Sequence, residues 1–427
     1  MKYGVIWHPE TRNLGDDLQA YAASRLLPRV DLALDGETLD EEPACGGEPV
    51  TVLLGGAILR KPYHWPPHTL IRPVCLGVHV SPEDVWGCKP ESLDGVGLRY
   101  LKEHAPIGCR DDATAALLTG MGIDNGVTCC LTLTLPTMTV TSDARYVCCV
   151  DVPTRAVEAL QRYEKAAHVQ VKVMTHQLPP TACEESFETR MARAEETLKF
   201  YAGAELVVTR RLHCALACLA LQVPVLMVFS SGYEDPRRFS PMDALFPVVS
   251  AEDFAASVER SGFPKLASNS AKYMAWRTAL QERAKNGIAR AEEGAAGAVI
   301  TEAERTAWRM TALTRLAETS AKKISRLEQD RYDLIHDKFE LLMTEDSVKN
   351  ALADQLTQPG LEDEMRRYVT KRYIKSLPLF KRRAARKRIK KLRASDQPVP
   401  EIDDTDPLML MTAQLTRLGW PAAPEKS

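Results

Sequence analysis

Short apolar runs alternate with helix-like segments along the chain as far as residue 265. KYGVIWH, TVLLGG and PVCLGVHV have the length and composition of strands, and VTCCLTLTL is predicted to be a further strand. A second series begins at RYVCCVDV and continues through VPVLMVFS to FPVVS. Two successive strand–helix series predict two α/β units with parallel sheets. Continuous apolar strands such as PVLMVF are typical of sheets that are covered on both faces.

This organisation predicts an α/β protein with two Rossmann-like domains facing a cleft, residues 1–140 and 141–265. Beyond them the strands stop, and residues 266–345 are predicted to form a helical extension. Its leucines partly keep a seven-residue spacing, which leaves a helical hairpin and a homodimer seam open as alternatives. Residues 346–427 are predicted to hold a basic helical segment and a disordered tail.

The composition is that of a globular protein, with 45% hydrophobic and 26% charged residues in a chain of 427. The first residues show no export signal, so we expect the 11 cysteines to be reduced thiols in a cytoplasmic protein. Cys214 and Cys218 lie four residues apart beside His213, a spacing that could hold a metal on a helix. Because buried free cysteines are common and CxxC is absent from the sequence, we predict no metal site and no cofactor.

The charge is unevenly distributed along the chain. Residues 366–393 contain 14 Lys/Arg and no Asp/Glu, while the rest of the chain carries 41 basic and 57 acidic residues. A basic amphipathic helix binds anionic membrane surfaces, so this segment predicts peripheral attachment at the inner membrane face. A solvated basic tail is the alternative. Nothing in the sequence suggests base recognition, so we predict no nucleic-acid partner.

Two arginines and a histidine gather in TRRLH, between an apolar strand and an apolar helix. The start of a helix already carries a partial positive charge, so cations there are locally unfavourable unless an anion is also present. A phosphate or carboxylate is the natural partner of a helix N-terminus. Arg211 and His213 are therefore the leading candidates for contact with an anionic ligand.

Other polar residues lie at predicted strand ends, where parallel sheets bind their ligands. After the first strand, Asn13 and Gly15 suit a tight turn, and we expect Asp17 to cap the following helix. Asp16 has two equally supported roles, helix capping and general acid–base catalysis. Further candidate ligand contacts at strand ends are Gly55, Gly56, His79, Arg110, Arg237 and Arg238.

For several of these candidates the alternatives stay open. Gly55 and Gly56 either let backbone amides approach an anion or form a plain turn. Arg110 is expected to reach the cleft, with Asp111 capping the helix behind it, and His79 is a second proton carrier. One residue of the pair 237–238 is expected to face the ligand.

Several of these motifs together resemble the polysaccharide pyruvyl transferase family. The apolar strand with Thr209, then Arg211-Leu212-His213 and LQVPVL, is similar to that family's C-terminal signature. NLGDDLQAYA and GCRDDAT are similar to its Asn-x-Gly-Asp turn and its Gly-x-Arg-Asp/Ser element. The resemblance covers roughly residues 1–250. Arg210 departs from the family's common Ser, so its role is open.

The resemblance implies a GT-B-like fold and transfer of pyruvyl from phosphoenolpyruvate, as a ketal, to two hydroxyls of a sugar. In that reading Arg211 holds the donor's anionic groups. His213 donates a proton or hydrogen bond to the phosphate or to the reacting oxygen. The residues 237–238 resemble the family's Arg-Phe stretch near the donor.

We therefore expect a cytoplasmic enzyme of envelope or exopolysaccharide biosynthesis, whose sugar acceptor is either free or lipid-linked. Two alternatives remain. One is a nucleotide-sugar-dependent glycosyltransferase on the same GT-B-like architecture, and the other is a non-catalytic scaffold that binds an anion.

Overall fold

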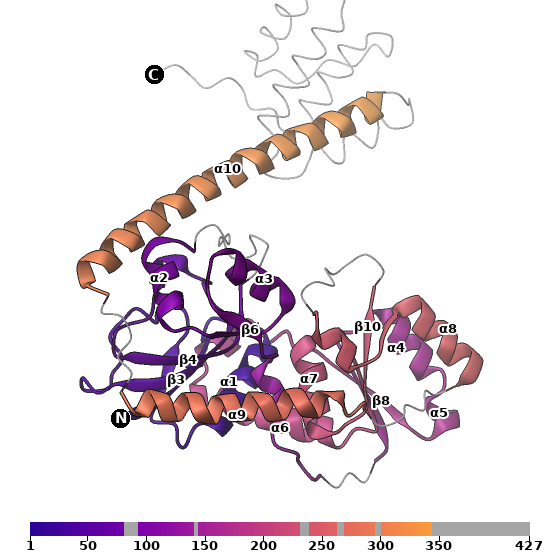
Figure 1. Ribbon diagram of the computed structural model, residues 1–427. Helices are drawn as coiled ribbons and strands as arrows, with labels where there is room; N and C mark the ends of the chain where they lie inside the picture. The colour runs from indigo at the N-terminus through magenta and orange to yellow at the C-terminus, as the bar shows by residue number, and fades with distance from the viewer. Residues whose placement is uncertain (81–92, 141–143, 231–238, 263–268, 295–299, 344–427) are drawn as a thin grey trace, which may run out of the picture. The chain divides into compact units, whose positions relative to one another are not determined.

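Two parallel sheets organise the chain in the computed structural model (Figure 1). The structure describes residues 1–80, 93–140, 144–230, 239–262, 269–294 and 300–343. The first sheet has the order β2-β1-β3-β4-β5-β6 and the second β11-β10-β9-β7-β8. All described strand pairs within them are parallel. The prediction of two parallel α/β sheets is confirmed.

The strands follow one another in the predicted series. The first sheet comprises β1 Lys2–Trp7, β2 Leu32–Asp35, β3 Val50–Ala57, β4 Ile71–His79, β5 Ile107–Cys109 and β6 Asn125–Val127. The second comprises β7 Tyr146–Val150, β8 Gln170–Met174, β9 Leu206–Thr209, β10 Val225–Phe229 and β11 Val248–Ser250.

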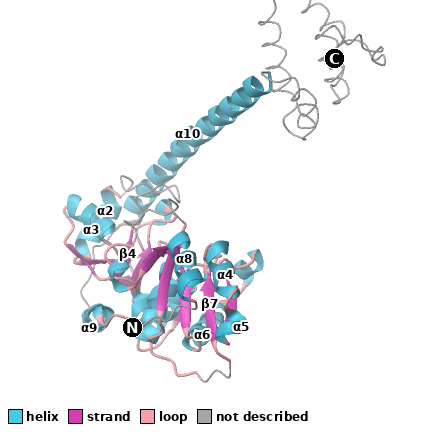
Figure 2. Ribbon diagram, turned by 90° about the vertical axis from the view of Figure 1, so that its right-hand side faces the viewer, coloured by secondary structure: helices cyan, strands magenta, loops and turns pink. Residues whose placement is uncertain are grey.

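Helices flank both sheets (Figures 1 and 2). The α-helices are α1 Leu14–Leu26, α2 Gly95–Glu103, α3 Asp112–Gly120, α4 Thr154–Gln161, α5 Glu164–Ala167, α6 Phe187–Ala202, α7 Leu212–Leu221, α8 Ala251–Ser261, α9 Lys272–Glu292 and α10 Glu302–Met343. Short 3-10 turns are η1 Pro62–His64, η3 Leu131–Thr134, η4 Pro180–Glu184 and η6 Met242–Leu245. None of the described helices is long and apolar enough to cross a membrane.

The core explains why the strands are apolar along their whole length. One apolar cluster continues from the first sheet through α1 and η3 to α6 and α7 on the second sheet. A second cluster fills the other face of the first sheet, under α2 and α3, and a third lies between the second sheet, α4 and α8. Both sheets are thus covered on both faces, and α7 is buried along nearly its whole length.

The segment VTCCLTLTL differs from its prediction. It leaves β6 after Val127 and forms the turn η3 in place of a strand. Cys129 has a φ of 69°, in the left-handed region, which interrupts extended backbone. Threonine hydroxyl groups form hydrogen bonds with backbone atoms here. Thr128 Oγ1 accepts from Gly77 N at 3.1 Å, and Thr134 Oγ1 donates to Leu131 O at 2.7 Å. Threonine side chains of this kind compete with ladder hydrogen bonds.

The predicted helical extension divides into two helices with different surroundings. α9 lies beside α1, β3 and β4, so it covers the first sheet (Figure 1). The chain falls into two units, residues 1–319 and 320–427, and the division lies within α10. Both sheets belong to the first unit. The basic segment 366–393 lies outside the described residues, so its membrane role stays a prediction.

Candidate active site

The strand order reverses at the same place in each sheet, between β1 and β3 and between β7 and β9. In open parallel sheets, ligands bind at the carboxyl ends of the strands beside such a switch point. The segments that follow these strands carry the polar residues Asn13, Asp16, Arg60, Asp151, Arg211 and His213. The topology therefore brings the two motifs of the sequence, NLGDD and RLH, to equivalent positions.

Backbone contacts join the two sheets at this place. Asn13 and Gln177 form an isolated antiparallel bridge. Leu14 N donates to His176 O at 2.9 Å, and Leu178 N donates to Arg12 O at 2.7 Å. The Arg12 side chain adds a bond from its Nε to Leu178 O at 2.9 Å. The turn after β1 thus lies directly against the segment that follows β8.

His213 lies in the first turn of α7, against the start of α1. A Cβ atom on Gly15 would stand 2.6 Å from His213 Nδ1, so only a glycine leaves room for the imidazole. The Nε2 atom of His213 is buried and has no hydrogen-bond partner among the described residues. Buried polar atoms are normally bonded, so this nitrogen is available to a ligand. We call the group of Asp16, Arg60, Arg110, Arg211 and His213 the junction site.

Each arginine of the junction site has a carboxylate partner. Arg60 Nη2 donates to Asp16 Oδ2 at 3.0 Å, and Arg110 Nε to Asp111 Oδ2 at 3.2 Å.

Arg211 Nε donates to Asp151 Oδ2 at 2.7 Å. The charge at the helix start, which the sequence left without a partner, is thus balanced within the protein. Among the described residues, the terminal nitrogens of Arg110 and Arg211 make no hydrogen bond, so both retain donors for a ligand.

The environment fixes the protonation of the two predicted catalytic groups. Burial raises the pKa of Asp16, but Arg60, His8 and His213 outweigh burial and hold that pKa at about 2. Burial lowers the pKa of His213 to about 3, and the neighbouring arginines Arg110 and Arg60 add to this effect. At neutral pH the free protein therefore presents an ionised Asp16 beside a neutral His213.

The residue that caps α1 differs from the predicted one. Asn13 is the capping residue, and its Oδ1 accepts from Gly15 N at 3.1 Å. Asp16 receives hydrogen bonds from Thr11 Oγ1 at 2.7 Å and from Arg60. Asp17 does not make the cap: its carboxylate pairs with Arg190 of α6 at 2.7 Å, and both side chains are almost fully buried. The pair crosses from one sheet's helix to the other's.

Arg110 and His79 share one carboxylate. Asp111 caps α3 through Thr114 N at 2.9 Å, as predicted, and its Oδ2 contacts His79 Nδ1 at 2.7 Å. His79 is 4% exposed. It shares the Asp111 carboxylate with Arg110, and its role as a ligand contact or proton carrier stays a prediction.

Close contacts and backbone conformation explain why Gly55 and Gly56 are glycines. A Cβ on Gly55 would meet Leu76 O at 2.4 Å, and Gly56 has a φ of 73° where the register of β3 and β4 shifts. Anion binding by their amides stays a prediction. The predicted donor contacts Arg237 and Arg238 lie outside the described residues.

Three residues near the site were not singled out from the sequence: Arg60, Asp151 and His176. His176 is buried, its Nε2 lies 2.6 Å from Tyr201 Oη, and its backbone N donates to Asp151 Oδ2 at 3.0 Å. Each of the three lies within three residues of the end of a strand, and that position was the available signal.

The cysteines beside His213 lie in the interior. Cys214 and Cys218 are free and buried within the core that joins the sheets. Among the described residues, no three His, Cys, Asp or Glu side chains are grouped as metal ligands.

Comparison with known proteins agrees with this geometry. A family model described as polysaccharide pyruvyl transferase matches residues 13–232, from the cap of α1 to beyond β10. The chain belongs to the polysaccharide pyruvyl transferase family. The matched region contains both sheets' switch-point segments, so the family resemblance and the junction site coincide. A search of curated proteins found no match to the chain.

Proposed function

We propose that this protein transfers the pyruvyl group of phosphoenolpyruvate onto two hydroxyls of a sugar, forming a ketal in envelope or exopolysaccharide biosynthesis. Membership of the polysaccharide pyruvyl transferase family supports a pyruvyl transfer role. The observation that carries the proposal is His213 Nε2, a buried nitrogen without a partner among the described residues, set against Gly15 and close to arginines.

The donor suits the charges of the junction site. Phosphoenolpyruvate carries a phosphate and a carboxylate on a three-carbon body, and guanidinium groups bind both in forked geometry. Arg211 and Arg110 supply terminal nitrogens for these groups, while Asp151 and Asp111 hold their Nε atoms in place. The N-termini of α1 and α7 add partial positive charge at the same point.

The reaction needs three proton movements. One proton is added to the methylene carbon of the donor, which becomes the methyl group of the ketal, and each of two acceptor hydroxyls loses one as its oxygen bonds to C2. The C2–O bond to phosphate breaks, and phosphate leaves with the remaining proton. Atoms and charges balance without a redox partner.

Asp16 and His213 differ in charge, so we assign them different proton transfers. Asp16, with a pKa of about 2, stays ionised and is too weak a base to keep a proton, so it orients an acceptor hydroxyl and relays its proton to the leaving phosphate. His213 is neutral in the free protein. A bound phosphate raises its pKa, because an opposite charge stabilises the imidazolium, and the protonated ring then serves the leaving phosphate.

Three broader features belong to the same proposal. We propose a GT-B-like pair of domains facing a cleft, supported by the two parallel sheets and by α9, which returns from the second sheet to cover the first. We propose that the acceptor is membrane-borne and that residues 366–393 bring this cytoplasmic enzyme to the inner membrane face. Their charge of 14 Lys/Arg without Asp/Glu supports this.

We also propose a homodimer through α10. Met310, Leu313, Ile324 and Leu327 are exposed on that helix and recur at heptad-like spacing, which supports a helix–helix seam.

A ligand screen followed by a phosphate-release assay tests the proposal. Phosphoenolpyruvate should raise the melting temperature of the purified full chain, and UDP-sugars should not. Release of phosphate should then depend on an added sugar acceptor. Stabilisation by UDP-sugars alone would favour the glycosyltransferase, and no response to either ligand would favour the scaffold.

A further inference from the structure

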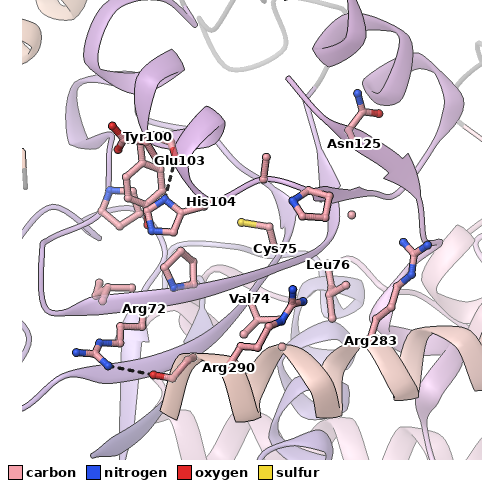
Figure 3. Close-up of a pocket in the computed structure, with 18 of the residues that line it drawn as sticks. Arg72, Val74, Cys75, Leu76, Tyr100, Glu103, His104, Asn125, Arg283 and Arg290 are labelled. Carbon is pink, nitrogen blue, oxygen red and sulfur yellow. Dashed lines mark hydrogen bonds between the residues drawn. The ribbon is translucent and has the colours of Figure 1, made fainter. Parts of the chain in front are cut away.

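A second hollow lies at the other end of the first sheet, away from the junction site. This cavity of about 750 Å³ is lined by the first residues of β4, the end of α2, the start of β6, and α9 (Figure 3). β4 has nine residues, so the two ends of this strand are about 26 Å apart. We call the cavity the α9 pocket. Its volume falls in the range of small-molecule sites.

The pocket arises from a gap in the sheet. Among the described residues, β5 pairs with β4 at Val78 alone, opposite Cys109, so the first residues of β4 have no strand on that side. α9 closes the gap from one face and packs directly on the strand. A Cβ on Gly287 would stand 2.3 Å from Val74 Cγ1. The hollow is therefore framed by a strand and a helix that pack closely together.

Four arginines line this pocket: Arg72, Arg283, Arg290 and Arg305. Arg283 and Arg290 project from α9 toward β4 (Figure 3). Arg72 donates to Ala291 O at 3.0 Å and Arg305 to Pro66 O at 2.9 Å. Among the described residues, none of the four has a carboxylate within ion-pair distance. The one carboxylate in the lining, Glu103, is near Arg99 at 3.9 Å.

Two buried groups mark the pocket as built for a ligand. Arg305 is 5% exposed, and a charge so deeply buried is normally paired. Tyr100 is 3% exposed, and its hydroxyl has no hydrogen-bond partner among the described residues. Glu302 and Asp40 act on Arg305 electrostatically, but neither forms an ion pair with it among the described residues. A buried cation and a buried donor without a directly bonded anion favour an anion between them.

We propose that the α9 pocket binds a phosphorylated small molecule of about nucleotide size. The arginines hold its phosphate groups, and the Tyr100 hydroxyl donates to one of them. Four cations exceed what a single carboxylate would neutralise, whereas a diphosphate ester carries up to about three negative charges. The organic part lies along Val74 and Leu76, on the face of β4 that α9 covers. This site is separate from the proposed reaction and does not depend on it.

Calorimetric titration of the full-length chain with ADP, inorganic pyrophosphate and orthophosphate tests the proposal. ADP should bind most tightly. The double variant Arg283→Gln/Arg290→Gln should weaken ADP binding at least about tenfold, because two charge-assisted contacts are lost. Both arginines are exposed, so the fold should be unaffected. Tyr100→Phe should weaken it by about threefold to tenfold.

Two controls separate this pocket from general charge and from the junction site. Lys285→Gln removes an exposed cation of the same helix that does not line the pocket, and it should leave ADP affinity within about twofold. Arg211→Ala should likewise leave ADP affinity unchanged. The proposal is overturned if no probe binds saturably, or if the double variant binds ADP as the wild type does. Binding of pyrophosphate but not of ADP would overturn the assigned ligand size.

Discussion

The junction site and the α9 pocket both concentrate arginines, but they balance the charge in opposite ways. In the junction site Arg60, Arg110 and Arg211 each bind an aspartate of the same chain. In the α9 pocket none of the four arginines has such a partner among the described residues. Paired arginines are held in one orientation before any ligand arrives, which is what catalysis requires. Unpaired arginines leave their charge to be neutralised by a ligand.

The difference predicts different selectivity. A ligand of the junction site finds arginines that are already paired with aspartates, so shape and hydrogen bonding contribute more to its affinity than net charge does. A ligand of the α9 pocket finds a concentrated positive charge, so its affinity should fall more steeply as salt is raised.

The largest expected effect concerns proton transfer at the junction site. His213→Asn should lower turnover by about 10²- to 10⁴-fold, the usual contribution of a general acid or base. Phosphoenolpyruvate binding, measured by calorimetry, should change much less, because the arginines remain. A variant that loses donor binding and turnover together would make His213 a binding residue.

Stability should separate paired from unpaired arginines. Arg190→Met leaves Asp17 buried without its cation, and should lower the free energy of unfolding by about 3–5 kcal/mol in denaturant titrations. The double variant Arg283→Gln/Arg290→Gln should change it by no more than about 0.5 kcal/mol, because exposed cations without partners add little. Equal losses in both variants would remove the contrast between the two regions.

Donor affinity should depend on Arg211. Arg211→Ala removes a charged hydrogen-bonding group, worth about 1.5–3 kcal/mol, so the KM for phosphoenolpyruvate should rise about tenfold to a hundredfold. Arg210→Ala is the matched control and should have a milder effect. The role of Arg211 as a donor contact is refuted if both variants show wild-type KM values.

The smallest expected effect is the number of protons taken up when phosphoenolpyruvate binds. The pKa of His213 is about 3 in the free protein, so at pH 6 the ring is unprotonated, and an approaching phosphate raises this pKa. Binding of phosphoenolpyruvate at pH 6 should therefore take up as much as about one proton. Titrations in two buffers of different ionisation enthalpy measure this uptake, and His213→Asn should abolish it. Uptake that persists in the variant would assign the proton to another group.

The sequence predicted the sheets because their strands are apolar throughout, and burial on both faces requires that pattern. It also predicted the turns that carry Asn13, Gly15, Asp16, Arg211 and His213. The sequence also indicated that these residues lie close together, because polar residues after parallel strands gather at one edge of a sheet.

What the sequence could not supply was the identity of distant partners. Asp17 looks like a capping residue locally, yet Arg190 lies 173 residues away and binds it. Asp151 balances Arg211 from another strand, so the helix start is less unfavourable than its own charges suggest.

The strand predicted for VTCCLTLTL from its local pattern was also wrong. The threonine hydroxyls and the left-handed Cys129 satisfy the backbone without a ladder. The sequence predicted a helical extension over residues 266–345, but not that α9 would cover the first sheet and frame a pocket.

The bonds between the two sheets have a mechanical consequence. The bridge of Asn13 and Gln177 and the buried pair of Asp17 and Arg190 adjoin His213 and Gly15. They therefore fix the position of one sheet relative to the other where His213 meets Gly15, so any displacement of the sheets would move these two residues least. In the proposed reaction, the distance between Asp16 and His213 would then stay nearly constant while a sugar enters farther from these bonds.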